Sequence, residues 1–154
     1  IPTLDEVLHL LKELNFNGQL NIELKTDIIQ YEGLVEKCLA LQSTESWPFA
    51  IVYSSFNPYT LVELKKINPT QEIGLLFESE EWANKGDAML EKEAYHPDLK
   101  LLDWTLEWNT NQLPLRVWTV NEDKDIKRCF ELQIEAIFTD YPQKALQLKE
   151  NYER

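Results

Sequence analysis

The sequence predicts an α/β fold in which parallel strands alternate with helices. Short apolar runs recur along the chain, and the segments between them carry apolar residues at helical spacing. We count about six strand-like runs, and alternation of this kind implies parallel strands with right-handed crossovers. The 154 residues contain no Ser/Gly linker and no low-complexity tract. We therefore expect a single domain over residues 1–154.

Local motifs define the elements of the first half of the chain. Thr3 and Glu6 have the spacing of a capping box and precede an amphipathic run, which predicts a helix. Asn57-Pro58 is typical of a helix start, with a capping side chain followed by Pro in the first turn. Ser54-Ser55-Phe56 is then expected to be a loop at a strand's carboxyl end. The elements expected up to residue 77 are helix 3–14, strand 19–25, helix 31–42, strand 49–54, helix 57–66 and strand 72–77.

The same alternation continues to the end of the chain. The expected elements are a helical region 79–93, a short strand or extended segment 99–102, strand 115–120, helix 123–132, strand 136–139 and helix 142–152. In parallel sheets and barrels, ligands bind at the carboxyl ends of the strands. We therefore expect the polar, aromatic and charged residues that follow these strands to converge on one rim.

Composition excludes two classes of partner. The formal charge of −12 arises from 27 acidic and 15 basic residues, and the basic residues are not clustered. Nucleic-acid binding needs clustered Lys and Arg, so we expect no nucleic-acid partner. The acidity suits a divalent-cation site, although a solvated acidic surface also accounts for it. Every apolar run stops far short of the ~20 residues that a membrane span needs, so we expect none.

Cysteines and the first residue add little about chemistry. Cys38 and Cys129 are isolated, without a CxxC motif or an adjacent His, which favours buried free thiols over a metal or redox site. The sequence begins at Ile1, without an initiator Met. Either an upstream part was removed or these residues belong to a longer chain. No targeting signal is visible, so the compartment stays open, with the cytoplasm as our expectation.

Glu23 and Lys25 are the most informative residues of the chain. They lie two positions apart near the end of an apparently buried strand, QLNIELK, so both side chains are expected on one face. Glu and Lys are rarely fully buried unless they are paired or bound to something. Two interpretations follow: a strand tip whose charges reach solvent or pair with each other, or a functional site.

Six segments resemble a known family. IPTLDEVL, LNIELK, IVYSSF, IGLLFE, LRVWTVNED and IFTDYP stand in the order and spacing of the later part of the glycerophosphodiester phosphodiesterases. The resemblance runs from residue 1 to about residue 148. It implies an α/β fold of the TIM (β/α)8 type, here a partial barrel of about six parallel strands, the third to the eighth, with intervening helices.

The resemblance also implies an activity and a site. The family hydrolyses glycerophosphodiesters to glycerol 3-phosphate and an alcohol, with a divalent metal, Mg²⁺ or Ca²⁺. By this resemblance Glu23 is a metal ligand and Lys25 binds the substrate phosphate. Ser55, Phe56, His96 and Trp118 are further candidates for the substrate pocket. A hard oxygen ligand suits either metal, and a neighbouring cation offsets phosphoryl charge.

The catalytic residues expected of the family are missing. The family carries two histidines, in HRG and HD motifs, and a Glu-x-Asp metal-binding pair, and none of these precedes the IELK motif here. The two histidines present are His9, expected on a helix surface beside Asp5, and His96, expected near a strand end. We therefore predict no catalytic residue in this chain and no hydrolysis by the chain alone.

The length has a structural consequence. A complete barrel of this type takes about 250 residues, so about 100 are absent, including the first two strands. The sequence thus predicts a domain truncated at its amino terminus, with open strand edges that a missing segment, a second copy in a homodimer or a rearrangement would cover. Two functions remain: the larger part of a metal-dependent phosphodiesterase, or a non-catalytic fragment that oligomerises or binds a phosphorylated ligand.

Overall fold

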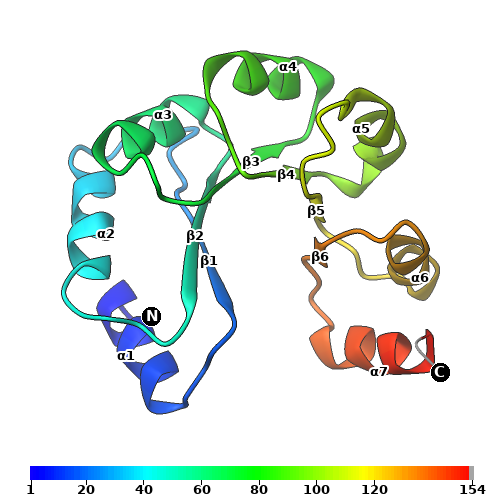
Figure 1. The fold of residues 1–154 in the computed structure, drawn as a ribbon, viewed down its shortest axis with the longest axis horizontal. Helices are drawn as coiled ribbons and strands as arrows, with labels where there is room; N and C mark the ends of the chain where they lie inside the picture. The colour runs from blue at the N-terminus through cyan, green and yellow to red at the C-terminus, as the bar shows by residue number, and fades with distance from the viewer. Residues whose placement is uncertain (153–154) are drawn as a thin grey trace. The chain divides into compact units, whose positions relative to one another are not determined.

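The computed structural model describes residues 1–152 and forms two compact units, residues 1–73 and residues 74–152. The elements of the first unit are α1 (Leu4–Glu13), β1 (Gln19–Glu23), α2 (Leu34–Gln42), β2 (Ala50–Ser55) and α3 (Pro58–Ile67). Strand β3 (Ile73–Phe77) begins at the boundary, and the second unit continues with α4 (Glu80–Met89), β4 (Ala94–Pro97), a 3-10 turn (Leu99–Leu101), α5 (Leu102–Trp108), β5 (Arg116–Val117), α6 (Asp123–Glu131), β6 (Ala136–Ile137) and α7 (Pro142–Tyr152). Within each unit the helices lie on one side of the strands (Figure 1).

The strands within each unit pair in parallel. In the first unit β1 pairs with β2, which places Glu23 opposite Ser54. In the second unit β3 pairs with β4 and β5 with β6, and single parallel bridges connect β4 with β5. Parallel neighbours need crossover connections, and a helix follows each of the six strands that residues 1–152 contain. The predicted α/β class with about six parallel strands and intervening helices is confirmed.

Both predicted helix starts are confirmed by their caps. The Thr3 hydroxyl accepts a hydrogen bond from the Glu6 amide at 3.3 Å, and the Glu6 carboxylate accepts one from the Thr3 amide at 2.7 Å. These two bonds satisfy amide groups that the first turn of a helix cannot pair internally. Asn57 caps α3 in the same way, because its side-chain oxygen accepts from the Tyr59 amide at 3.0 Å.

Two regions differ from the prediction. The expected strand or extended segment 99–102 is instead a 3-10 turn that leads into α5, and the strand lies earlier, at Ala94–Pro97. The Asp98 side chain accepts from the Lys100 amide at 2.8 Å and so starts the turn. The strand was not predicted because its sequence, AYHP, lacks a clear alternation of apolar and polar residues and contains Pro, which argues against a central strand. Ser54 and Ser55 belong to β2, so the strand extends into the expected loop.

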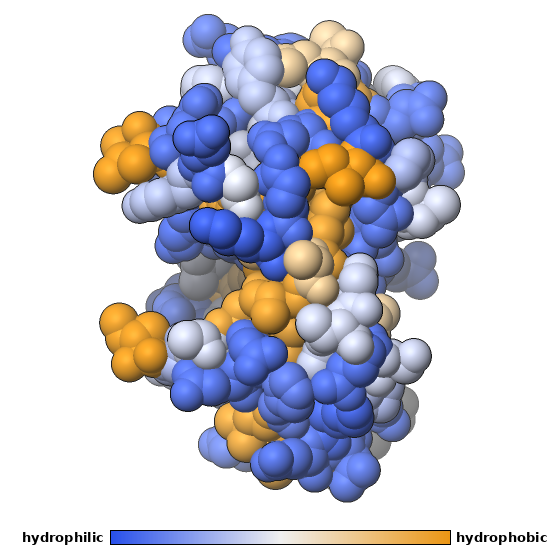
Figure 2. All heavy atoms as spheres, turned by 90° about the vertical axis from the view of Figure 1, so that its left-hand side faces the viewer, coloured by the Kyte–Doolittle hydropathy of each residue, from blue (hydrophilic) through white to orange (hydrophobic). Residues whose placement is uncertain are grey.

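The first unit has an apolar core between its strands and helices. Val52, Tyr53, Leu61 and Leu64 are fully buried. Burial raises the pKa of the Tyr53 hydroxyl, because the phenolate would lose its hydration. Cys38 is a buried free thiol, as predicted, and so is Cys129 in the second unit. Figure 2 shows one face of the molecule, which is largely hydrophilic, with hydrophobic side chains visible between the hydrophilic ones.

A histidine is buried inside the second unit. His96 is completely inaccessible on β4, its ring lies 5.4 Å from that of Phe138, and neither ring nitrogen has a hydrogen-bond partner among residues 1–152. Burial and, to a lesser extent, the positive charge of Arg116 lower the pKa of His96 to about 3. The ring is therefore neutral at physiological pH. It occupies space above Gly74, where an added Cβ would lie 2.1 Å from Nε2.

We predict that Gly74→Ala destabilises the protein by about 1–3 kcal/mol, since the new methyl group would overlap the His96 ring. The free energy of unfolding from urea titration checks this. In a His96→Ala background the ring is gone, so Gly74→Ala should cost less than about 0.5 kcal/mol. Equal costs in the two backgrounds would show that the ring does not set the requirement for glycine.

We also predict that the protein loses stability relative to His96→Leu as the pH falls from 7 to 5. The unfolded chain binds a proton at His96 below pH 6.5, whereas the folded chain does so only near pH 3. Stability therefore rises with pH through this window, by at most about 1.4 kcal/mol per unit. Urea titrations of both proteins at several pH values measure the difference. Parallel pH profiles would contradict the buried neutral ring.

Candidate functional site

The two charged residues of the IELK motif lie at the carboxyl end of β1. Glu23 is the last residue of the strand, and Lys25 follows it by two positions. Both are exposed. The expected strand 19–25 stops at Glu23, and both charges reach solvent, as the first of the two interpretations allowed. Because both groups are exposed, neither has a large desolvation cost to offset, and both are available to a ligand.

The residue between them is anchored. Leu24 is buried, at 3% exposure, and its amide donates to the Ser54 carbonyl at 2.7 Å. Its own carbonyl accepts from the Ser55 hydroxyl at 2.7 Å. Glu23 and Lys25 therefore extend from a backbone that is hydrogen-bonded to β2 through both the amide and the carbonyl of Leu24, although strand β1 has ended.

Ser55 and Phe56 lie next to this loop in the same unit. Ser55 is fully buried at the end of β2, and its hydroxyl contacts backbone groups instead of lining a pocket. Phe56 is half-buried and directly precedes the capping residue of α3. The first unit thus brings together four predicted site residues, Glu23, Lys25, Ser55 and Phe56.

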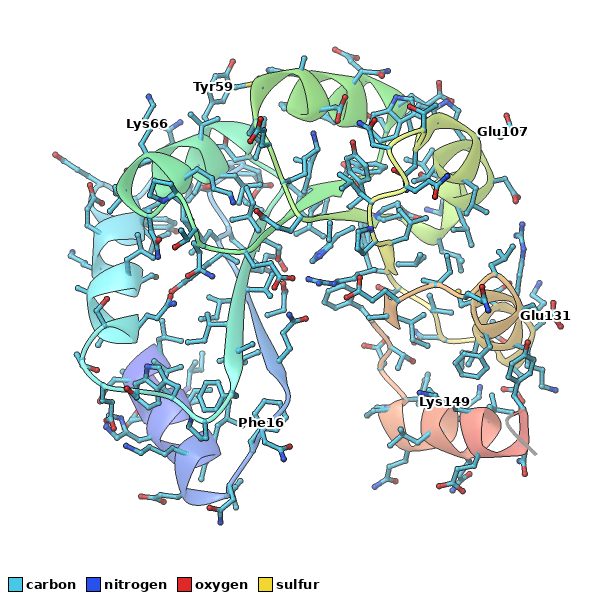
Figure 3. All side chains as sticks on the ribbon, in the orientation of Figure 1. Phe16, Tyr59, Lys66, Glu107, Glu131 and Lys149 are labelled. Atoms are coloured by element: carbon cyan, nitrogen blue, oxygen red, sulfur yellow. The ribbon has the colours of Figure 1, made fainter. Side chains whose placement is uncertain are left out.

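A cavity begins one residue after Lys25. Its volume is about 530 Å³, within the range of small-molecule sites, and it is lined mainly by polar residues of the loop after β1 and the first turns of α2 and α3. Thr26, Glu36 and Glu63 are among the residues that line it. Tyr59, which also lines it, is 56% exposed and points outward from α3 in Figure 3.

The remaining predicted residues, His96 and Trp118, lie in the second unit. His96 is inside β4 and inaccessible, so it does not occupy the rim position predicted for it. Trp118 directly follows β5 and is half-buried, and its indole N–H donates to the His96 carbonyl at 2.7 Å. The structure therefore connects the two residues through the His96 backbone and turns the imidazole away from solvent.

A polar cluster lies beyond β5 and β6, in the segments LRVWTVNED and IFTDYP. The Asn121 side chain donates to the Asp140 carboxylate at 2.7 Å and accepts from the Thr139 hydroxyl at 3.1 Å and the Asp140 amide at 3.0 Å. Lys144 donates to the Asn121 carbonyl at 3.0 Å. Asn121 therefore ties the two strand ends of this unit together. The sequence placed these residues after consecutive strands, on the expected rim, but assigned none of them to the site.

The described residues do not complete a metal site. Residues 1–152 contain no group of three or more His, Cys, Asp or Glu side chains arranged to hold a metal ion. Mg²⁺ needs six ligands and Ca²⁺ six to eight, and Glu23 offers one exposed carboxylate. The donor set fits a divalent cation only as a contributor to a larger site.

No histidine among the described residues is placed for proton transfer beside Lys25. His9 is exposed on α1, where Nδ1 lies 2.9 Å from the Asp5 carbonyl oxygen and Nε2 lies 2.9 Å from the Glu45 carboxylate. These contacts, chiefly the one with the Asp5 carbonyl, raise the pKa of His9. His96 is neutral and inaccessible.

None of the helices in residues 1–152 has the length and apolar character that a membrane span needs.

Comparison with known proteins gives a consistent family. The model of the glycerophosphoryl diester phosphodiesterase family matches residues 1–144. A glycerophosphodiester phosphodiesterase of Caldanaerobacter subterraneus is 33% identical over 96% of this chain and 61% of its own length. One of Bacillus altitudinis is 31% identical over 97% of this chain and 63% of its own. The chain thus spans a little over three fifths of these relatives.

Solved structures show the same fold. A phosphodiesterase of Oleispira antarctica, in complex with the product sn-glycerol-3-phosphate, superposes with a TM-score of 0.77 at 23% identity and covers 97% of this chain and 62% of its own. A glycerophosphodiester phosphodiesterase of Parabacteroides distasonis gives 0.75 at 20% identity, covering 99% and 66%. With the family model matched over residues 1–144, this chain belongs to the glycerophosphoryl diester phosphodiesterase family.

Proposed function

We propose that this chain forms the phosphate-binding part of an enzyme that hydrolyses glycerophosphodiesters to glycerol 3-phosphate and an alcohol. The match of the family model across residues 1–144 carries the proposal. Relatives about one third identical bear the name of this activity, and the Oleispira phosphodiesterase binds sn-glycerol-3-phosphate. The exposed IELK motif on an anchored loop supplies a group of suitable charge for such a ligand.

Lys25 is proposed to bind the phosphate. Its ammonium is exposed at the end of β1, where ligands of parallel α/β folds are bound. A cation at this position stabilises the negative charge on the phosphoryl oxygens, which increases as the alcohol leaves. Arg or Lys at such positions also orients the phosphodiester before reaction.

Glu23 is proposed to contribute one oxygen to a divalent metal, Mg²⁺ or Ca²⁺. When bound, such an ion would act as a Lewis acid at the phosphate oxygens. Because residues 1–152 do not complete its coordination, the other ligands would be water molecules and protein groups beyond these residues. The same holds for the proton-transfer groups, since His9 and His96 are both unsuitable for this role.

We predict that Lys25→Ala, in the longest natural form of the protein that contains these residues, lowers kcat/KM for glycerophosphocholine by about 10²–10³-fold, because a charge-stabilising group is lost. Release of glycerol 3-phosphate measures this. Lys66→Ala is the matched control, since Lys66 is an exposed lysine that points outward from α3 (Figure 3). Full activity of the Lys25 variant would refute the assignment.

We predict that residues 1–154 alone release no glycerol 3-phosphate from glycerophosphocholine, with either Mg²⁺ or Ca²⁺ added, because the part of the chain that the structure describes has no accessible pair of histidines beside Lys25. Turnover by the purified chain at a rate proportional to its concentration would contradict this. Lys25→Ala serves as the control, because activity that comes from a contaminating enzyme would persist in this variant.

We predict that the longest natural form loses its activity in the presence of a chelator and regains it on adding Mg²⁺ or Ca²⁺ in excess. Glu23→Gln removes the charge of one proposed ligand, so half-maximal reactivation should need at least tenfold more metal. Undiminished activity after chelation, or an unchanged metal requirement of the Glu23 variant, would contradict the proposed ligand.

A further inference from the structure

The loop that carries Lys25 is held at the residue on each side of it. On the amino-terminal side, the Leu24 carbonyl accepts from the Ser55 hydroxyl at 2.7 Å. On the carboxyl-terminal side, the Thr26 carbonyl accepts from the Asn57 side-chain amide at 3.0 Å. The carbonyl groups of the residues before and after Lys25 are thus hydrogen-bonded, while its own side chain stays exposed.

Ser55 makes two hydrogen bonds in opposite directions. Its hydroxyl donates to Leu24 and accepts from the Asn57 amide at 3.0 Å. The residue is completely buried, so water does not compete for either bond. A buried hydroxyl that both donates and accepts fixes the positions of both partners. Removing it leaves those partners without a hydrogen bond.

Asn57 also has two roles. Its side-chain oxygen caps α3 by accepting from the Tyr59 amide at 3.0 Å, while its side-chain nitrogen donates to Thr26. A second bond, between the hydroxyls of Thr26 and Thr60 at 2.6 Å, joins the same loop to α3. Thr26 and Asn57 are buried, at 4% and 8% exposure. The start of α3 therefore sets the position of the loop after β1.

We infer that Ser55 and Asn57 are positioning residues for Lys25, which hold the backbone on both sides of it so that its ammonium meets the substrate phosphate in one place. The inference rests on the proposed function of Lys25. It assigns Ser55 a role through the backbone and not in direct contact with substrate, since its hydroxyl is buried and engaged. Such support of a ligand-binding group by a rigid second layer is what keeps a site preorganised.

The chain offers a closely matched control for this test. Ser54 is the adjacent residue of β2, is equally buried, and accepts from the Asn21 side chain at 3.0 Å. Its hydroxyl is not hydrogen-bonded to residues 24–26, and the backbone carbonyl that accepts from the Leu24 amide is kept when Ser54 is replaced by Ala. Ser54→Ala and Ser55→Ala therefore remove the same group, one position apart, on opposite sides of the strand.

The test is a double-mutant cycle on kcat and KM for glycerophosphocholine in the longest natural form of the protein. Ser55→Ala should lower kcat/KM about tenfold, chiefly by raising KM, because the ammonium no longer has a fixed position. Combined with Lys25→Gln, the same change should lower it less than twofold. Ser54→Ala should lower it less than twofold in both backgrounds.

Asn57→Asp provides a second variant that keeps the cap of α3 and loses the donor to Thr26. It should repeat the Lys25-dependent effect while the protein stays folded, and amide hydrogen exchange of Leu24, Lys25 and Thr26 should quicken in both positioning variants. Equal losses with and without Lys25, or an equal loss in Ser54→Ala, would overturn the inference. If Lys25→Gln alone keeps full activity, the proposed function itself is overturned.

Discussion

The parallel pairing of β1 with β2 is the constraint on which the site depends. It sets Glu23 opposite Ser54, and the ladder then continues one step further, through the bond between the Leu24 amide and the Ser54 carbonyl. In a parallel ladder, alternate residues turn their backbone groups to opposite sides. Beyond the last ladder bond, side chains donate the hydrogen bonds. The Ser55 hydroxyl donates to the Leu24 carbonyl, and the Asn57 side-chain amide donates to the Thr26 carbonyl. A strand end that would otherwise fray is thus kept ordered while its charged side chains remain exposed.

This arrangement assigns two conflicting requirements, an accessible side chain and a fixed backbone, to different residues. A phosphate-binding lysine must be accessible, yet exposed side chains lose affinity when their backbone moves. Here the neighbouring residues hold the backbone, because Leu24 and Thr26 are buried and hydrogen-bonded. Lys25 itself stays exposed. The same alternation is absent around His96, where the polar group itself is buried against Gly74 and Phe138 and its titration is suppressed. A histidine in that environment serves packing.

Local motifs predicted those elements whose physical cause is local. The capping pair Thr3 and Glu6 and the Asn57-Pro58 start contain their own hydrogen-bond partners within a few residues, so the sequence was sufficient. Helix α5 was missed because no side chain caps it: it continues from a 3-10 turn, which starts at Asp98 after a short strand that ends in Pro97. For the site, two charges near a strand end singled out Glu23 and Lys25, and the resemblance gave them roles. Their exposure, the burial of Ser55 and the inaccessibility of His96 depend on pairings between distant residues. Such tertiary contacts leave no spacing pattern in a single sequence.

The central claim is that the loop after β1 is a phosphate-recognition element held in place by its neighbours. It is tested most directly by titrating isotope-labelled residues 1–154 with sn-glycerol 3-phosphate and following the backbone amide resonances. We expect saturable shifts centred on Leu24, Lys25 and Thr26, which disappear in Lys25→Ala and weaken as salt is added. Shifts confined to other parts of the chain, or shifts at the loop that survive the loss of Lys25, would contradict the account.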